Sequence, residues 1–165
     1  NDAVKIIWED ILTNFKKDGV LAAGLGARDT LRLEMGYLLY GSDINIDIHP
    51  YKAGLGWITN LNKGYFIGRD KIISMRDKDE SRLVYFEMIE KSIPRSGFEI
   101  LVNSKVVGVV TSGTISPSLN KGIGIAYMEK KYINKGMKFS VKIRNKRKEA
   151  VIVEAPFYTS GTLNN

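Results

Sequence analysis

Cysteine is absent from this sequence of 165 residues, and histidine occurs once, as His49. These absences exclude a thiolate nucleophile, a cysteine-ligated zinc site and a redox-active dithiol, and we expect no metal site. No apolar run approaches the roughly 20 residues that a membrane-spanning helix requires, so we expect no membrane partner. With 44% hydrophobic residues the chain can bury a sizeable core, which excludes collagen, low-complexity disorder and a disulfide-stapled miniprotein.

Acidic residues are scarce in the second half of the chain. Residues 81–165 contain 14 Lys and Arg but 6 Asp and Glu, a net charge of +8, whereas residues 1–80 contain 11 and 12, a net charge of −1. The two halves therefore differ in net charge. A basic half can indicate a protein that binds nucleic acid.

The clustered basic residues at 130–131 and 142–148 would be the contact surface for a nucleic acid. Residues 142–144, however, alternate basic and apolar side chains as a half-exposed strand does, and residues 145–148 are typical of the polar tip of a hairpin. Positive charge attracts nucleic acids regardless of their sequence, so it is weak evidence for a specific nucleic-acid site. We therefore expect no nucleic-acid partner.

The first 40 residues show helical patterns. Apolar side chains recur every three or four positions between residues 2 and 17, which predicts an amphipathic helix that Asp2 caps and Gly19 ends. Residues 30–40 are rich in Leu, Glu, Arg and Met and predict a second helix, which begins at residue 28 or 29. Both segments place the first part of the chain in a helical region.

The segment between residues 41 and 80 alternates loops and short elements. Residues 41–50 form a polar loop, residues 55–61 are expected to form a strand, and residues 62–64 a turn. A short helix is expected at residues 69–76. The sequence thus predicts an α+β fold for the whole chain.

Beyond residue 80 the pattern is one of strands and turns. Six β-rich runs are separated by Gly, Pro, Asn and Ser, and residues 103–105 form a hairpin turn between two of them. Six short strands within about 85 residues predict a small antiparallel barrel or sandwich. The runs are residues 83–89, 98–102, 106–111, 123–128, 139–143 and 150–154.

Residues 77–81, Asp-Lys-Asp-Glu-Ser, mark the expected domain boundary. They are five polar residues at the point where the pattern changes from helix to strand, and they divide the chain into residues 1–80 and 81–165. The chain starts at Asn1 rather than at a methionine and shows no signal-peptide pattern. We expect it to be a fragment of a longer polypeptide.

Two short motifs suggest binding sites that their neighbouring residues do not support. Residues 24–26, Gly-Leu-Gly, resemble the start of a dinucleotide-binding motif, but Asp29 occupies the position of the third glycine and would repel a pyrophosphate. Asp43, Asn45 and Asp47 alternate as in a calcium loop, but the required glycine and glutamate are absent. We expect these three to be solvated turn residues.

Arg28 is the leading candidate for a binding residue. It lies at the glycine-rich start of the expected second helix, shares a face with Arg32 four residues on, and precedes Tyr37 and Tyr40 on the same helix. Arginine binds carboxylates with paired hydrogen bonds and tyrosine stacks on rings, so the set can line a pocket for a flat aromatic ligand with carboxylates. Surface pairing between Asp29 and Arg32 explains the spacing without a ligand. On spacing alone both interpretations stay open.

Residues 24–34, Gly-Leu-Gly-Ala-Arg-Asp-Thr-Leu-Arg-Leu-Glu, followed by Leu-Tyr-Gly at 39–41, closely resemble the signature of aminomethyltransferase, the T-protein of the glycine cleavage system. Further blocks match in order along the whole chain, and this colinearity is more specific than any single block. The resemblance corresponds to the C-terminal part of the family's length. The further blocks are Ala-Gly-Leu-Gly-Trp at 53–57, Phe-Ile-Gly at 66–68, Pro-Arg-Ser-Gly at 94–97, Val-Gly at 107–108, Val-Thr-Ser-Gly at 110–113, Ser-Pro-Ser-Leu at 116–119, Ile-Gly-Ile-Ala-Tyr at 123–127 and Pro-Phe-Tyr at 156–158.

The resemblance implies a fold and an activity. The family takes an aminomethyl group from the lipoyl arm of H-protein and passes its methylene to tetrahydrofolate, with release of ammonia, in glycine catabolism. Residues 1–80 would belong to the folate-binding body, and residues 81–165 would form a six-stranded antiparallel β-barrel of the Greek-key or jelly-roll kind. The implied location is the cytoplasm of a bacterium, which we favour, or the mitochondrial matrix of a eukaryote.

The resemblance also implies which residues act. In such enzymes the positions matching Arg28 and Tyr37 contribute to the folate site, whereas the catalytic aspartate and the glutamate that holds the pterin lie upstream of Asn1. No catalytic residue and no metal are then expected in this chain, and the chain alone is expected to be inactive. Tetrahydrofolate would be the acceptor substrate and lipoylated H-protein the protein partner.

Three alternatives remain. A folate-dependent iron–sulfur assembly protein is similar but carries Lys-Gly-Cys, then Tyr or Phe and Gly-Gln-Glu, whereas residues 63–70 read Lys-Gly-Tyr-Phe-Ile-Gly-Arg-Asp. The folate-binding domain of a dimethylglycine or sarcosine oxidoreductase would be fused to a flavin domain. The non-enzyme alternative is a basic β-barrel binding module that uses the charge of residues 81–165.

Overall fold

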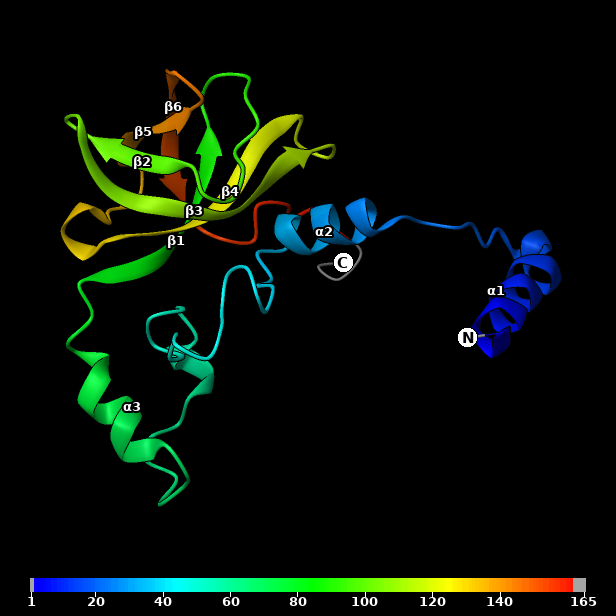
Figure 1. The fold of residues 1–165 in the computed structure, drawn as a ribbon, viewed down its shortest axis with the longest axis horizontal. Coiled ribbons are helices and arrows are strands. Elements are labelled where there is room, and N and C mark those ends of the chain that lie inside the picture. The colour runs from blue at the N-terminus through cyan, green and yellow to red at the C-terminus, as the bar shows by residue number, and fades with distance from the viewer. Residues whose placement is uncertain (1, 162–165) are drawn as a thin grey trace.

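The computed structural model describes residues 2–161 and consists of a closed β-barrel with helical segments outside it (Figure 1). The helix α2 (Leu25–Glu34) lies against the barrel, whereas α1 (Asp2–Asn14) and α3 (Arg69–Arg76) lie apart from it (Figure 1). The α+β class predicted from the sequence is therefore confirmed. Among residues 2–161, none of the helices has the length and hydrophobicity needed to cross a bilayer.

Six antiparallel strands close the barrel in the order β1-β4-β3-β2-β5-β6, with β6 paired to β1. Strands β2, β3 and β4 follow one another as hairpins while β1 pairs with β4, which is a Greek-key arrangement. Each of the six β-rich runs in the sequence overlaps one strand, so the expected barrel is confirmed. The strands are β1 (Ser81–Met88), β2 (Glu99–Val102), β3 (Lys105–Ser116), β4 (Lys121–Glu129), β5 (Lys138–Ile143) and β6 (Lys146–Val153).

Two hairpin turns are tighter than the sequence predicts. Residues 103–104, with φ of 48° and 69°, form the whole turn between β2 and β3, so the expected turn residue 105 already belongs to β3. The polar tip expected at residues 145–148 is wrong, because residues 144–145 join β5 to β6 and Lys146 begins β6. Short loops with positive φ match the right-handed twist of paired strands.

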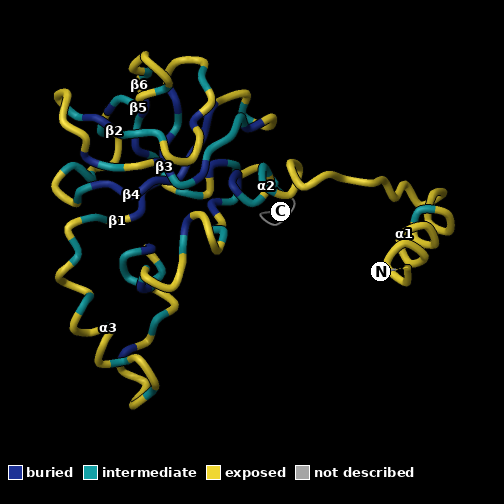
Figure 2. Tube along the Cα trace, in the orientation of Figure 1, coloured by how far each residue is buried: buried dark blue, intermediate teal, exposed yellow. Residues whose placement is uncertain are grey.

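Two apolar cores form on opposite faces of the same strands. The first fills the barrel and includes Phe86 of β1 and Met128 of β4, both fully buried. The second lies outside the barrel, where Leu33 of α2 packs with Ile123 and Ile125. Strand β4 is therefore buried on both faces. Figure 2 shows that buried residues are concentrated in the barrel and beneath α2.

The first helix matches the pattern of the sequence but has no packing partner in the described chain. It runs over residues 2–14 with Asp2 in its first turn, continues as a 3-10 turn (Lys16–Asp18), and ends at Gly19, whose φ is 78°. None of the residues in α1 is buried, and Trp8 on its apolar face is 52% exposed. Figure 2 shows the whole helix at the end of an exposed segment.

The second helix is shorter than expected and starts earlier. It spans Leu25–Glu34 rather than residues 30–40, because Gly36 adopts a φ of 72° just beyond its end. The amide of Gly36 donates to the carbonyl of Leu33 at 2.9 Å and that of Tyr37 to the carbonyl of Arg32 at 2.8 Å. These two bonds are the Schellman pattern that ends a helix.

The strand expected at residues 55–61 is wrong. The segment forms a 3-10 turn (Gly56–Ile58) in which Ile58 and Thr59 donate to carbonyls three residues earlier. A strand needs a neighbouring edge to pair with, and the closed barrel has none to offer. The helix expected at residues 69–76 is confirmed as α3.

Candidate functional site

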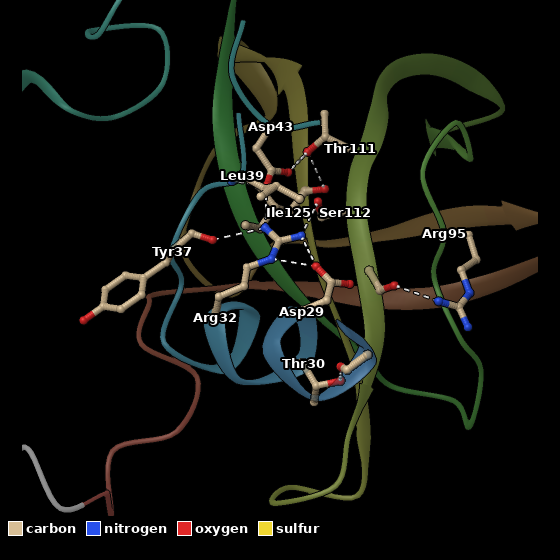
Figure 3. Close-up of polar contacts among 12 residues, drawn as sticks. Asp29, Thr30, Arg32, Tyr37, Leu39, Asp43, Arg95, Thr111, Ser112 and Ile125 are labelled. Atoms are coloured by element: carbon tan, nitrogen blue, oxygen red, sulfur yellow. Dashed lines mark hydrogen bonds and ion pairs between the residues drawn. The ribbon is translucent and has the colours of Figure 1, made fainter. Parts of the chain in front are cut away.

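The guanidinium of Arg32 fixes α2 to the barrel. Its Nη1 lies 2.6 Å from Asp43 Oδ2, its Nη2 donates to Ser112 Oγ at 2.9 Å, and its Nε donates to Asp29 Oδ1 at 2.8 Å (Figure 3). The side chain of Arg32 is 11% exposed and that of Asp43 is fully buried. The expected surface pair with Asp29 is thus one edge of a buried network.

A bulge in β3 aims two side chains into this network. Val110 pairs with Ala126 and Ser112 with Ile125, which leaves Thr111 as the extra residue. The Thr111 hydroxyl donates to Asp43 Oδ1 at 2.5 Å, while Ser112 accepts from the guanidinium (Figure 3). A bulge redirects side chains that would otherwise alternate between faces.

Asp43 is a buried structural acceptor rather than the solvated turn residue expected from the sequence. Besides the two contacts above, its Oδ2 accepts from the amide of Leu39 at 2.9 Å, and its carbonyl accepts from the hydroxyl of Tyr127 at 2.9 Å. Burial and the charge of Asp43 together raise the pKa of Tyr127 above its usual range. The phenol of Tyr127 therefore stays protonated and serves as a donor.

Glu34, the last residue of α2, makes a second polar anchor. Its buried carboxylate accepts from the hydroxyls of Ser116 and Ser118 and from the amide of Ser118 at 3.2 Å. Its carbonyl accepts from the amides of Phe157 and Tyr158 at 2.9 and 3.1 Å. Strand β3 and the segment after the barrel therefore both hold the end of α2.

The end of α2 determines where Tyr37 points. The carbonyl of Tyr37 accepts from Arg32 Nη1 at 3.1 Å, and the carbonyl of Gly36 accepts from the hydroxyl of Tyr85 at 3.0 Å. A side chain at position 36 would lie 2.5 Å from the Cβ of Ala155, so only glycine fits there. With its backbone held in this way, Tyr37 turns its ring away from the network (Figure 3).

A cavity of about 600 Å³ opens on the outer side of α2. Arg28 and Tyr37, the two site residues taken from the sequence, both line it, whereas Tyr40 does not. The lining is largely apolar, with arginine and tyrosine as its polar groups, and such a wall suits a ring that carries acidic groups. The lining residues are Ala23, Gly24, Leu25, Ala27, Arg28, Leu31, Arg32, Met35 and Tyr37.

Sequence reasoning missed part of this wall. Leu31 and Met35 lie three and seven residues after Arg28, a spacing that places all three on one face of a helix. That signal was present in the sequence, because the helix expected from residue 28 or 29 to residue 40 already contained Leu31 and Met35. Arginine has no acceptor atom, so this wall can bind and orient an anion but supplies no general base.

His49 belongs to a different cluster. Its Nε2 hydrogen-bonds to Asp79 Oδ2, and its Nδ1 accepts from the amide of Lys52 at 3.4 Å. The ring is buried and links the polar loop to the segment before β1. Within residues 2–161, no group of three His, Asp or Glu side chains is arranged to hold a metal ion.

Comparison with known families decides the assignment. The family model described as "Glycine cleavage T-protein C-terminal barrel domain" matches residues 81–159, and the model described as "GCVT N-terminal domain" matches residues 1–63. The chain belongs to the glycine cleavage T-protein family. The resemblance read from the motifs is confirmed, including its restriction to the C-terminal part of the family.

Individual relatives agree with this assignment. A probable aminomethyltransferase of Pyrococcus furiosus is 45% identical over 92% of this chain and 40% of its own length. An aminomethyltransferase of Alkaliphilus oremlandii is 44% identical over 98% of this chain and 44% of its own length. This chain therefore spans about two fifths of the length of the curated relatives it matches.

A solved structure of the same family extends the likeness to three dimensions. The crystal structure of the glycine cleavage system aminomethyltransferase T from Bartonella henselae superposes with a TM-score of 0.84 and 27% identity. The match covers 95% of this chain and 44% of that chain. The barrel and the helical segments beside it are thus family features.

Proposed function

We propose that this chain supplies the C-terminal part of an aminomethyltransferase. The enzyme would take the aminomethyl group from the lipoyl arm of H-protein, transfer its methylene to tetrahydrofolate and release ammonia. The observation that carries the proposal is the ordered match of both family models, residues 1–63 and 81–159, within one chain. The two relatives named above are described as aminomethyltransferases.

Tetrahydrofolate would occupy the cavity beside α2. Arg28 would bind its carboxylates and Tyr37 would offer a stacking face together with a hydroxyl for hydrogen bonding. Cavities of roughly 300–1,000 Å³ are typical of small-molecule sites, and this one holds about 600 Å³. Arg32 would act as a positioning residue, because it joins the Tyr37 backbone to the buried network.

The partners follow from the same assignment. Lipoylated H-protein would be the donor and tetrahydrofolate the acceptor substrate, with no metal required for the transfer. The enzyme would act in the cytoplasm of a bacterial cell or in the mitochondrial matrix of a eukaryotic one. The iron–sulfur assembly protein is less well supported, because Tyr65 stands where its hallmark cysteine would be.

We also propose that residues 1–80 and 81–165 belong to different domains. The two family models match on either side of residues 64–80, and the barrel begins at Ser81. The network around Arg32 and Asp43 would then be the contact between them. Such a contact would hold the folate-binding wall in a fixed place on the barrel.

A chimera tests the proposed function. The matching segment of the Alkaliphilus oremlandii aminomethyltransferase is replaced by this chain, and ammonia release is measured with aminomethylated H-protein and tetrahydrofolate. We expect turnover that depends on both substrates. A folded chimera without turnover would refute the proposal.

The chain by itself should bind tetrahydrofolate weakly or not at all and should not catalyse the transfer. Its wall at α2 carries two arginines and a tyrosine, and none of them supplies a carboxylate base for the aminomethyl chemistry. The same assay on the isolated chain checks this expectation. Turnover at the rate of the chimera would show that the roles given to the residues are wrong.

A further inference from the structure

A second cavity lies at one end of the barrel, away from α2. It has a volume of about 640 Å³ and lies between the connection from β1 to β2 and the β5–β6 hairpin. Its apolar part is formed by Ile93, Phe98 and Ile143, of which Phe98 and Ile143 pack against the core inside the barrel. The mouths of β-barrels are common sites for small ligands.

The polar part of this cavity is basic. Its rim is formed by Arg95, Arg144, Lys146 and Lys148, and the lining includes no acidic residue. Lys148 is neutralised by Glu90 at 2.5 Å. Within residues 2–161, the other three cations of the rim form no ion pair with an acidic side chain.

Several lysines elsewhere on the barrel surface differ from Arg95, Arg144 and Lys146 because they have acidic partners. Several of them form ion pairs with glutamates on neighbouring strands or turns, as Lys121 does with Glu87 at 2.9 Å and Lys142 with Glu99 at 2.6 Å. Mixed charge along these strands does not suit a long polyanion, which needs a continuous basic stripe. The unpaired charge at the cavity lies close to an apolar floor formed by Phe98 and Ile143.

Two segments carry the residues of the rim, and hydrogen bonds hold the first of them against β3. The amide of Gly97 donates to the carbonyl of Val110 at 2.8 Å, and the amide of Val110 donates to the carbonyl of Phe98 at 2.9 Å. Arg95 Nη1 donates to the carbonyl of Gly113 at 3.4 Å, which ties its side chain to β3 (Figure 3). Arg144 lies in the two-residue turn of the β5–β6 hairpin, with a φ of 56°.

We propose that this cavity binds a small organic anion with a flat apolar body and at least two negative charges. The body would lie on Phe98 and Ile143, and Arg95 and Arg144 would bind its anionic groups from two separate segments. Guanidinium groups suit such ligands because they form paired hydrogen bonds with planar anions. The site is distinct from the cavity beside α2 and does not depend on the function proposed there.

Calorimetric titration of the chain with naphthalene-1,5-disulfonate tests the proposal. We expect binding whose affinity falls about tenfold or more in the double variant Arg144→Glu and Lys146→Glu, because two attractive charges become repulsive. The matched control is Lys130→Glu with Lys138→Glu, which changes the net charge equally at exposed positions outside this cavity. The control should bind as the parent chain does.

Two further measurements complete the test. Ethane-1,2-disulfonate, which lacks the rings, should bind about tenfold more weakly or worse, because it buries no apolar surface. In nuclear magnetic resonance spectra of the parent chain, the naphthalene compound should shift the signals of Phe98 and Ile143. Three results would each overturn the proposal. They are an equal loss of affinity in both double variants, signal shifts confined to α1 or α2, and tighter binding of single-stranded DNA than of the disulfonate.

Discussion

The barrel and the first helix of this chain have equally clear apolar patterns but opposite degrees of burial. Phe86 in β1 is fully buried and packs edge-on against Phe139, with ring centroids 5.5 Å apart. Trp8 in α1 is 52% exposed, and Ile7 beside it is 58% exposed. A periodic pattern therefore indicates which element forms, whereas burial requires a partner surface, and the described residues provide one for the barrel strands but not for α1.

The comparison also separates two kinds of contact around α2. The face of α2 toward the barrel is held by Leu33 in the apolar core and by the carboxylate of Glu34. The opposite face carries Arg28 and lines the cavity beside Tyr37. One short helix thus has a face that stabilises the fold and a face that is available to a ligand.

The largest expected effect sharpens the contrast between the barrel and α1. Phe86→Ala should lower the free energy of unfolding by about 3–5 kcal/mol, because it leaves a cavity in a closed core. Trp8→Ala should change it by less than about 0.5 kcal/mol, as surface substitutions do. Urea unfolding followed by far-ultraviolet circular dichroism measures both. Equal losses would mean that α1 is packed in solution.

The next effect concerns the buried ion pair. Asp43→Ala should cost about 3 kcal/mol, because it leaves the guanidinium of Arg32 buried without its main partner. The control Asp29→Ala removes a partner that is 45% exposed and should cost less than about 1 kcal/mol. The same unfolding experiment compares the two variants. A cost for Asp29→Ala as large as that for Asp43→Ala would place the anchor of α2 at its exposed edge.

A third prediction tests the boundary between the two regions. Trypsin should cut near residues 77–81 well before it cuts within the barrel, because Lys78 lies in an exposed segment and the strands are hydrogen-bonded on both sides. Mass spectrometry of a time course identifies the first products. Early cleavage after Lys105 or Lys121 would contradict a separately protected barrel.

The smallest effect concerns pH and the barrel surface. Lys131 and Lys105 lie 2.8 and 3.0 Å from Glu129 and hold the pKa of its carboxyl below the usual value of 4.5. Their stabilising contribution is present above that usual value and is lost as the pH falls through the lowered pKa. The melting temperature should therefore decrease less steeply between about pH 6 and pH 3 in Glu129→Gln than in the parent chain. The control Glu9→Gln in α1 should follow the parent curve.

The strands and the third helix could be read from the sequence because their signals are local. Each strand overlaps one of the β-rich runs that Gly, Pro, Asn and Ser separate in the sequence, and α3 occupies the expected residues 69–76. The strand expected at residues 55–61 failed because pairing is a tertiary property. The early end of α2 was also local, since Gly36 is the glycine that closes a Schellman motif.

The candidate site was predictable only in part. The resemblance singled out Arg28 and Tyr37, which share a cavity, and the helical spacing of Leu31 and Met35 could have extended the wall. The burial of Asp43 could not be foreseen, because its partner Thr111 is 68 residues away and reaches it through a bulge. Bulges leave no clear mark in a single sequence.

The most direct test of the account is the Arg28→Ala substitution in the chimera, with Arg28→Lys as the matched variant. We predict that Arg28→Ala raises the KM for tetrahydrofolate about ten- to a hundredfold while the melting temperature stays the same, because a charged hydrogen bond to the ligand is lost. Arg28→Lys retains the charge, so its KM for tetrahydrofolate should lie between that of the parent chimera and that of Arg28→Ala. An unchanged KM together with a lower melting temperature would show that Arg28 stabilises the fold and does not bind folate.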